Sequence, residues 1–85
     1  YVADRGNHVI RKISLDGEVV TLAGTVGVAG AVNATGTAAR FSSPSSIAVA
    51  GDGTLFVADT GNNAIRRIST AGEVTTFAGG LGVTG

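Results

Sequence analysis

Side chains that could bind a cation or a polar ligand are concentrated in two short segments, residues 4–8 and 59–63. Both contain the sequence Asp-x-Gly-Asn, which places a carboxylate and an amide three residues apart. Asp52 and Asp59 do not complete a calcium loop, because that loop needs the spacing D-x-[DN]-x-[DN]-G and a distant glutamate. One histidine and no cysteine cannot form a zinc site within the chain. We therefore predict hairpin turns at these segments, with no metal ligand and no cofactor.

Catalytic patterns are equally weak. Residues 24–30 are rich in glycine, but neither a lysine nor the start of a helix follows them, as a phosphate-binding loop would require. A flexible surface loop explains these glycines. No serine has a histidine and an acid in the same local cluster. We predict no catalytic residue in the chain, and partners contributed from elsewhere remain the alternative.

The charges are balanced, since six basic residues and six acidic residues give a net charge of zero. Phosphate binding needs a basic surface, so we do not expect nucleic acid as a partner. Two basic pairs recur along the chain, and we expect cross-strand ion pairs between them and the glutamates of the following strands. The pairs and their expected partners are Arg11-Lys12 with Glu18, and Arg66-Arg67 with Glu73.

The size of the chain limits its stability. A domain as short as these 85 residues buries only about 60% of the surface of its unfolded chain. No stretch approaches the roughly 20 apolar residues that span a bilayer, so we expect no membrane span. The sequence contains no methionine, and we expect a fragment or a processed chain.

The strongest signal is an internal repeat with an offset of 55 residues. YVADRGNHVIRKIS at 1–14 returns as FVADTGNNAIRRIS at 56–69, and GEVVTLAG at 17–24 returns as GEVTTFAG at 72–79. Aligned without gaps, residues 1–30 and 56–85 share 18 identical pairs, which indicates a duplication. A repeat of this length indicates an architecture built from repeated units.

Within each copy the pattern predicts strands joined by turns, because short β-branched runs alternate with Asp-Gly, Gly-Asn and Ala-Gly segments. The third strand of a copy alternates imperfectly, which suggests a bulge. The expected fold class is all-β, with four-stranded antiparallel up-and-down meanders. Each such sheet has two apolar faces and cannot bury both alone, so these units occur in rings or stacks. The expected strands are 1–3, 9–14 and 18–23 in the first copy, and 46–50, 55–58, 64–69 and 73–78 in the second.

These residues carry a family resemblance. Pro44-Ser45-Ser46-Ile47-Ala48-Val49 followed by Asp52-Gly53 and FVADTGNNAIRRIS resembles the NHL repeat, a blade type of β-propellers. Ser46 stands where this repeat usually has glycine. The resemblance implies about two blades per chain: a truncated blade at 1–23, a Gly/Ala-rich linker at 24–44, a complete blade at 45–79 and the start of the next linker at 80–85. The linker is similar to that of bacterial secreted or cell-surface NHL proteins.

A long loop inside a compact domain is usually either functional or disordered. In an antiparallel meander, alternate connections emerge at the same end, so this linker should lie beside both Asp-x-Gly-Asn turns. The alternative is that Asp4, Asn7, Asp59 and Asn62 only hydrogen-bond their own turns. The candidate binding residues are Arg5, Asn7 and His8 from one turn, Thr60, Asn62 and Asn63 from the other, and Arg40 from the linker.

From the resemblance we expect a non-catalytic binding or scaffold module, with no enzyme activity, that takes a protein or carbohydrate ligand. Its partners would be other propeller blades, supplied by self-association or by a longer parent chain, and we do not expect the chain alone to be a stable monomer. Two alternatives stay open because fold alone does not define function. One is part of a propeller lyase or hydrolase whose channel metal is held by other blades. The other is an RNA-binding propeller.

Overall fold

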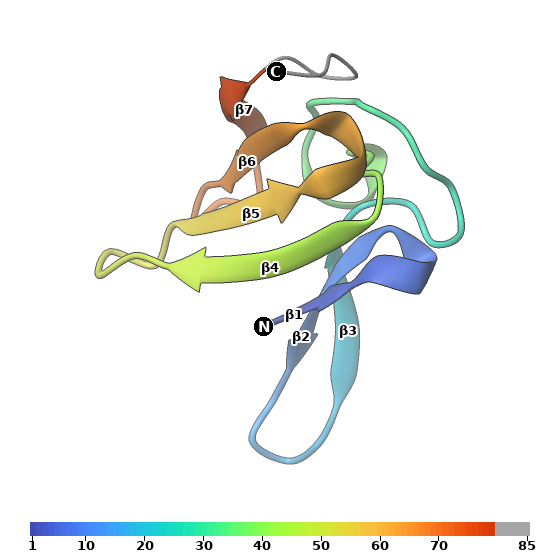
Figure 1. The fold of residues 1–85 in the computed structure, drawn as a ribbon. Coiled ribbons are helices and arrows are strands. Elements are labelled where there is room, and N and C mark those ends of the chain that lie inside the picture. The colour runs from blue at the N-terminus through green and yellow to red at the C-terminus, as the bar shows by residue number, and fades with distance from the viewer. Residues whose placement is uncertain (80–85) are drawn as a thin grey trace.

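The computed structural model describes residues 1–79, which form two antiparallel sheets whose strands follow one another in chain order (Figure 1). This confirms the all-β fold and the up-and-down meander. The expected linker start at 80–85 lies outside the described residues. The first sheet contains β1 (Val2–Asp4), β2 (Val9–Ile13) and β3 (Val19–Ala23), and the second contains β4 (Pro44–Val49), β5 (Leu55–Asp59), β6 (Ala64–Ile68) and β7 (Val74–Gly79).

The register of the strands confirms a bulge in each copy. The ladder shifts between Ile65 and Arg66 in the second sheet, and the first sheet shifts at the equivalent place. Because Ile65 pairs with Ala78 and Arg66 with Thr76, the extra residue is Phe77 of the fourth strand. The imperfect alternation of the third strand therefore marked the right point, although the inserted residue belongs to its neighbour.

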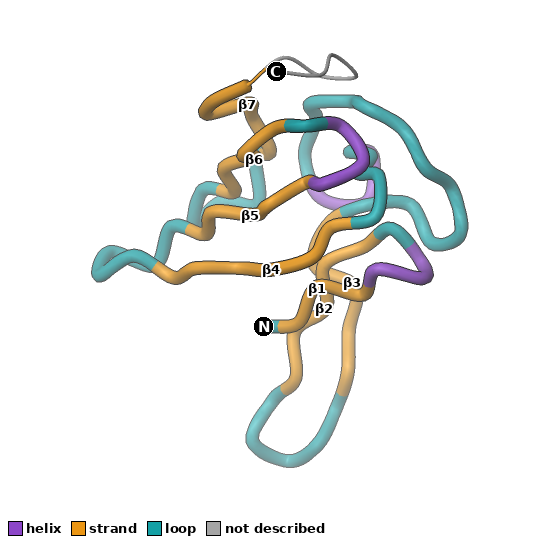
Figure 2. Tube along the Cα trace, viewed as in Figure 1, coloured by secondary structure: helices purple, strands orange, loops and turns teal. Residues whose placement is uncertain are grey.

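Short 3₁₀ turns connect β1 to β2 in the first sheet and β5 to β6 in the second (Figure 2). They are η1 (Arg5–Asn7) and η3 (Thr60–Asn62), and a third turn, η2 (Gly36–Ala38), lies in the linker. In the described part of the chain, no helix is long and apolar enough to cross a membrane.

The 3₁₀ turns that follow β1 and β5 end in the left-handed backbone region. His8 has a φ of 59° and Asn63 a φ of 53°, and asparagine and histidine adopt this region more readily than most residues. Gly24 has a φ of +96°, and a Cβ there would lie 2.7 Å from the carbonyl oxygen of His8. Gly24 is thus required by close backbone contact, which corrects its interpretation as part of a flexible loop.

The hydrophobic core lies between the two sheets and includes side chains from the linker. Along β5, Leu55, Val57 and Asp59 are buried while the alternate side chains face the other way, as the two-residue period of a strand requires. The linker segment, expected to be a loop beside the blades, supplies Ala39 and Phe41 to the buried cluster. The buried cluster comprises Ile10, Ala23, Ala39, Phe41, Leu55, Val57, Ile68 and Val74.

Replacing Ile68 by alanine should lower the free energy of unfolding by about 2–5 kcal/mol, because the side chain is 1% exposed and its loss leaves a cavity. The matched control is Ile13→Ala, the same residue at the equivalent position of the first copy, where the side chain is 51% exposed. This control should cost about 1 kcal/mol or less. Urea denaturation of dilute protein measures both, and equal losses would contradict a core that lies between the sheets.

Candidate functional site

The Asp-x-Gly-Asn turn of the second copy is organised around the buried carboxylate of Asp59. Its Oδ1 accepts a hydrogen bond from the backbone N–H of Ser42 at 2.7 Å. Its Oδ2 accepts one from the Asn62 amide at 2.8 Å and one from the Arg66 guanidinium at 2.7 Å. Asp59 and Arg66 are both completely buried, so the charges of this ion pair are shielded from water.

Arg66 also holds the linker in place. Nη1 donates to the carbonyl oxygen of Arg40 at 2.9 Å, and Nη2 donates to the carbonyl oxygen of Val32 at 2.8 Å and to Asn33 Oδ1 at 2.9 Å. The guanidinium carbon lies 4.9 Å from the centre of the Phe41 ring, within the range of a cation–π contact. One side chain thus joins the second sheet to the middle of the linker and to its C-terminal part.

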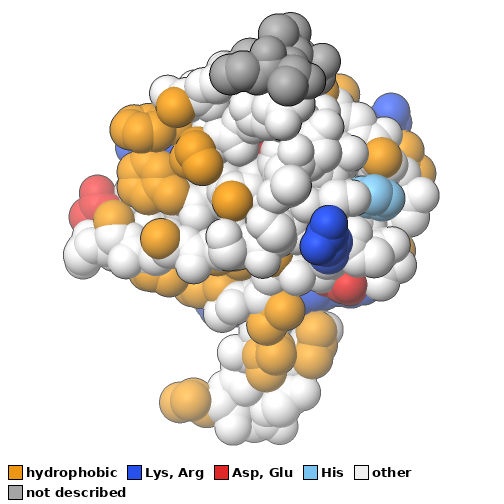
Figure 3. All heavy atoms as spheres, in the orientation of Figure 1, with side chains coloured by type: hydrophobic (Ala, Val, Ile, Leu, Met, Phe, Trp, Pro, Cys, Tyr) orange, Lys and Arg blue, Asp and Glu red, His pale blue; other side chains and the backbone are white. Residues whose placement is uncertain are grey.

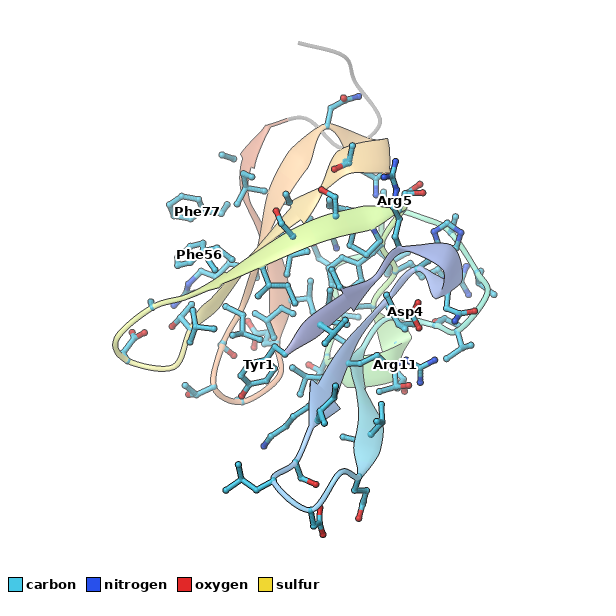
Figure 4. The ribbon with its side chains drawn as sticks, turned by 60° about the horizontal axis from the view of Figure 1, so that its bottom comes forward. Tyr1, Asp4, Arg5, Arg11, Phe56 and Phe77 are labelled. Atoms are coloured by element: carbon cyan, nitrogen blue, oxygen red, sulfur yellow. The ribbon has the colours of Figure 1, made fainter. Side chains whose placement is uncertain are left out.

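The same residues in the first copy form a more open arrangement. Asp4 Oδ2 accepts from Asn7 Nδ2 at 2.9 Å and from Arg11 Nε at 3.1 Å, and Arg11 donates further to Thr21 at 2.8 Å. The side chains of Arg11 and Asp4 are 25% and 30% exposed. Figure 4 shows Arg11 extended toward Asp4 at the side of the first sheet. The Asn7 amide, and then Arg11, hold the pKa of Asp4 below its ordinary value of 3.8.

These contacts settle two of the sequence-based alternatives. Asp4 and Asn7 hydrogen-bond each other within their turn, as do Asp59 and Asn62. They do not bond only there, because Arg11 also donates to Asp4, Ser42 and Arg66 donate to Asp59, and Asn62 donates to the linker. The expected ion pairs with Glu18 and Glu73 are wrong for Arg11 and Arg66, which pair instead with the aspartate that ends the preceding strand, Asp4 or Asp59. The basic pairs are also split by the strand period, because Arg66 faces the core while Arg67 is exposed.

The linker lies against both turns, as the meander geometry predicts. Gly27 donates its N–H to the carbonyl oxygen of Asn7, and Ser43 donates its N–H to His8 Nδ1 at 2.9 Å. On the second copy, Asn62 donates to the carbonyl oxygen of Gly30 at 2.8 Å. The linker therefore connects the two turns at one end of the sheets. We call this end, formed by η1, η3 and the linker, the loop end.

The seven candidate binding residues divide into two groups at the loop end. Asn62 is buried and Asn7 and His8 are partly buried, and the hydrogen bonds of all three hold the fold together. The remaining four are exposed, although the hydroxyl of Thr60 lies 2.6 Å from that of Ser45. The exposed group consists of Arg5, Arg40, Thr60 and Asn63.

Two of these exposed residues border an open depression. Thr60 and Asn63 line a space of about 290 Å³ together with the apolar side chains of Ala58, Ile65 and Ala78. Among residues 1–79, no group of three histidine, cysteine, aspartate or glutamate side chains is placed to hold a metal ion.

Sequence reasoning missed the residues that fix the linker, Asn33 and Phe41, and the central role of Arg66. Arg66 gave a signal, since it is identical in both copies, but identity alone does not show which side chain is buried. Asn33 and Phe41 lie outside the aligned repeat, so no comparison within the chain could have found them.

Replacing Arg66 by methionine should lower the free energy of unfolding by about 3–5 kcal/mol, because it leaves the buried Asp59 carboxylate without its partner. The matched control Arg11→Met breaks the equivalent, partly exposed pair and should cost about 0–1 kcal/mol. Chemical denaturation measures both variants. A similar cost at the two positions would contradict the central role of the buried pair.

The first copy provides a pH-dependent test. The folded pKa of Asp4 is lowered below 3.8, so its ionised form stabilises the protein above about pH 3.8, and this contribution is lost as the pH falls further through the folded pKa. Asn7→Ala and Arg11→Gln should each raise the pKa of Asp4 toward 3.8, because both side chains lower it. An NMR titration of the Asp4 carboxyl carbon measures both shifts, and an unchanged pKa in either variant would refute this account.

Known proteins are similar to this chain in sequence and in fold. A family model described as the Teneurin NHL domain matches residues 1–69. The chain is 45% identical over 69 residues to Protein SUPPRESSOR OF QUENCHING 1, chloroplastic, of Arabidopsis thaliana, and the match covers 80% of this chain and 6% of that protein.

Two solved structures from Bacteroides thetaiotaomicron VPI-5482 are similar in fold. The first, a structural genomics protein of unknown function, has a TM-score of 0.85 and 26% identity over 94% of this chain and 20% of its own. The second, an auxiliary nutrient binding protein, has a TM-score of 0.75 and 23% identity over 91% of this chain and 23% of its own. The chain thus spans a small part of each of these proteins.

With most of its length matched by the family model, the chain belongs to the Teneurin NHL domain family, and its two sheets are blades of an NHL-type β-propeller.

Proposed function

We propose that this part of a β-propeller is a non-catalytic scaffold whose loop end binds a protein through acidic groups of that protein. The observation that carries the proposal is that some side chains of the turns hold the fold while others are exposed. The positions that are identical in the two copies, such as Asp59, Asn62 and Arg66, use their side chains to hold the fold. Of the positions that differ, Arg5, Thr60 and Asn63 are exposed and left to contact a ligand, whereas His8 is partly buried and accepts a hydrogen bond from Ser43.

The charge at the loop end favours an acidic partner. The ion pairs within residues 1–79 involve Arg11 and Arg66, so the exposed guanidinium groups of Arg5 and Arg40 are available to carboxylates. Arginine is enriched at protein interfaces, where its planar group binds a carboxylate through two hydrogen bonds. One structure with this fold is titled a nutrient binding protein, so the fold is compatible with ligand binding, and a carbohydrate is the other ligand class to be tested.

The scaffold part of the proposal includes further blades as partners, from a longer chain or from other copies. We further propose an extracellular or cell-surface location, which is supported by the similarity of residues 24–44 to the linkers of secreted bacterial NHL proteins. A channel metal held by other blades and RNA binding are the competing functions. RNA binding would be recognised by a steep loss of affinity with added salt.

The test compares the double variant Arg5→Ala/Arg40→Ala with the wild type on an array of Asp- and Glu-rich peptides and on an array of glycans. Peptide binding by the wild type and its loss by about tenfold or more in the double variant are expected, because charged contacts of this kind contribute strongly to recognition. The matched control is Lys12→Ala/Arg67→Ala, which removes two exposed cations away from the loop end and should bind normally. If the wild type binds glycans and no peptide, the ligand is a carbohydrate and the proposed protein ligand is wrong. Equal losses of peptide binding in both double variants would refute the loop-end site.

A further inference from the structure

The ring of His8 joins turn η1 to the C-terminal part of the linker. Ser43 donates its backbone N–H to His8 Nδ1 at 2.9 Å. Because a backbone N–H can only donate, Nδ1 must be unprotonated, and the proton of the neutral ring lies on Nε2. The side chain is partly buried, and Figure 3 shows histidine atoms (pale blue) at the surface of the molecule. The contact therefore requires a neutral imidazole in a place that water can reach.

This bond connects two parts of the chain that are otherwise held separately at the loop end. Within residues 1–79, it is the one hydrogen bond between the segment 5–8 and the segment 40–43. Residues 40–42 are bound instead to the second blade, through Arg66 to the carbonyl oxygen of Arg40 and through Asp59 to the N–H of Ser42. If the His8 bond is lost, these linker residues stay with the second blade while η1 stays with the first.

The backbone at Ser43 adds to the sensitivity of this contact. Ser43 has a φ of 49°, in the left-handed region that residues other than glycine seldom adopt. Such a conformation persists only where the surrounding contacts hold it. The bond to His8 is one of these contacts, so its loss allows the segment before β4 to relax.

The charged groups on the elements that meet at His8 are mostly basic. Asp4 is the one acid among them, and it is already paired with Arg11. A positive charge on His8 is therefore added to a group of cations and gains no uncommitted acid from these elements. β3 and β4 carry no charged residue, and the groups on β1, η1, β2 and the linker are Asp4, Arg5, Arg11, Lys12 and Arg40.

We propose that His8 is a pH-sensitive link that fixes the spacing of Arg5 and Arg40, so that the loop end binds acidic groups most tightly when His8 is neutral. This inference rests on the proposed function of the loop end. Histidine changes its charge between about pH 5 and 8, and the charged ring carries a proton on both nitrogens. Nδ1 can then no longer accept from Ser43, and two N–H donors face each other. The turn that carries Arg5 separates from the linker that carries Arg40, and a partner that needs both guanidinium groups loses one.

The second copy supplies a variant that keeps the link but does not titrate. Asn63 stands where the first copy has His8, and its φ of 53° is close to the 59° of His8. In His8→Asn the side-chain oxygen lies as many bonds from the backbone as Nδ1 does, so it can accept from Ser43 at every pH. His8→Ala removes the acceptor at every pH. Circular dichroism checks that both variants keep their strands.

The link is measured first without any ligand, by NMR of the Ser43 amide proton. As the pH is lowered from about 8 to about 5, the resonance in the wild type should move to the position that it has in His8→Ala, because the bond is lost as the ring becomes charged. In His8→Asn it should not move. A wild-type resonance that stays constant, or one that moves equally in His8→Asn, would overturn the switch.

Binding is then measured with an oligo-aspartate peptide at about pH 8 and about pH 5.5, where aspartate, with an ordinary pKa of about 3.9, stays ionised. The affinity of the wild type should fall about tenfold at the lower pH, which corresponds to the loss of one charge-assisted contact. His8→Asn should bind equally at both values, and His8→Ala should bind weakly at both.

Tighter binding by the wild type at the lower pH would mean that the charge on His8 only attracts the peptide, and would overturn the proposal. No binding at either pH, with a Ser43 resonance that still follows pH, would overturn the proposed ligand and its regulation while the link itself stands. The two measurements therefore distinguish a failure of the switch from a failure of the loop-end function.

Discussion

The buried ion pair between Asp59 and Arg66 is the interaction on which the arrangement of the two blades depends. Burying two charges is costly, and the cost is offset only when the geometry is good and the remaining donors and acceptors are satisfied. Here the linker provides most of that compensation, since its carbonyl groups and Asn33 accept from the two terminal nitrogens of Arg66 while Ser42 donates to Asp59. Arg66 Nε is buried and has no hydrogen-bond partner among the described residues. The linker is therefore held against the second blade by these bonds, and its Phe41 forms part of the core.

The function proposed for the loop end follows from this use of side chains. The Asp, Asn and Arg side chains hold the fold, and the residue after each Asp, Arg5 in the first copy and Thr60 in the second, is exposed. The other variable position is exposed as Asn63 in the second copy and partly buried as His8 in the first. A rigid scaffold that presents variable side chains at one end is a common arrangement for recognition, and here the exposed Arg40 of the linker adds a third contribution to the surface.

The repeat also shows how one sequence pattern takes two roles according to its neighbours. Ile10 and Ile65 are equivalent, yet the first is buried and the second is exposed. The pair Asp4–Arg11 is partly exposed, whereas Asp59–Arg66 is buried under a linker. Units of quasi-repetitive folds are stabilised by contacts with their neighbours, which is why equivalent residues differ in burial between the two copies.

The sequence alone determined the fold class, the seven strands, the presence of a bulge beside the third strand of a copy and the nearness of the linker to both turns. Turn residues, strand period and a 55-residue repeat are signals that can be recognised within the sequence itself. Only the tertiary structure decided which side chains are buried. Arg66 and Arg67 are adjacent and chemically alike, but the pleat directs Arg66 alone into the core. Likewise Asn33 and Phe41 acquire their roles from segments more than twenty residues away, and contacts between distant segments leave no periodic pattern in the sequence.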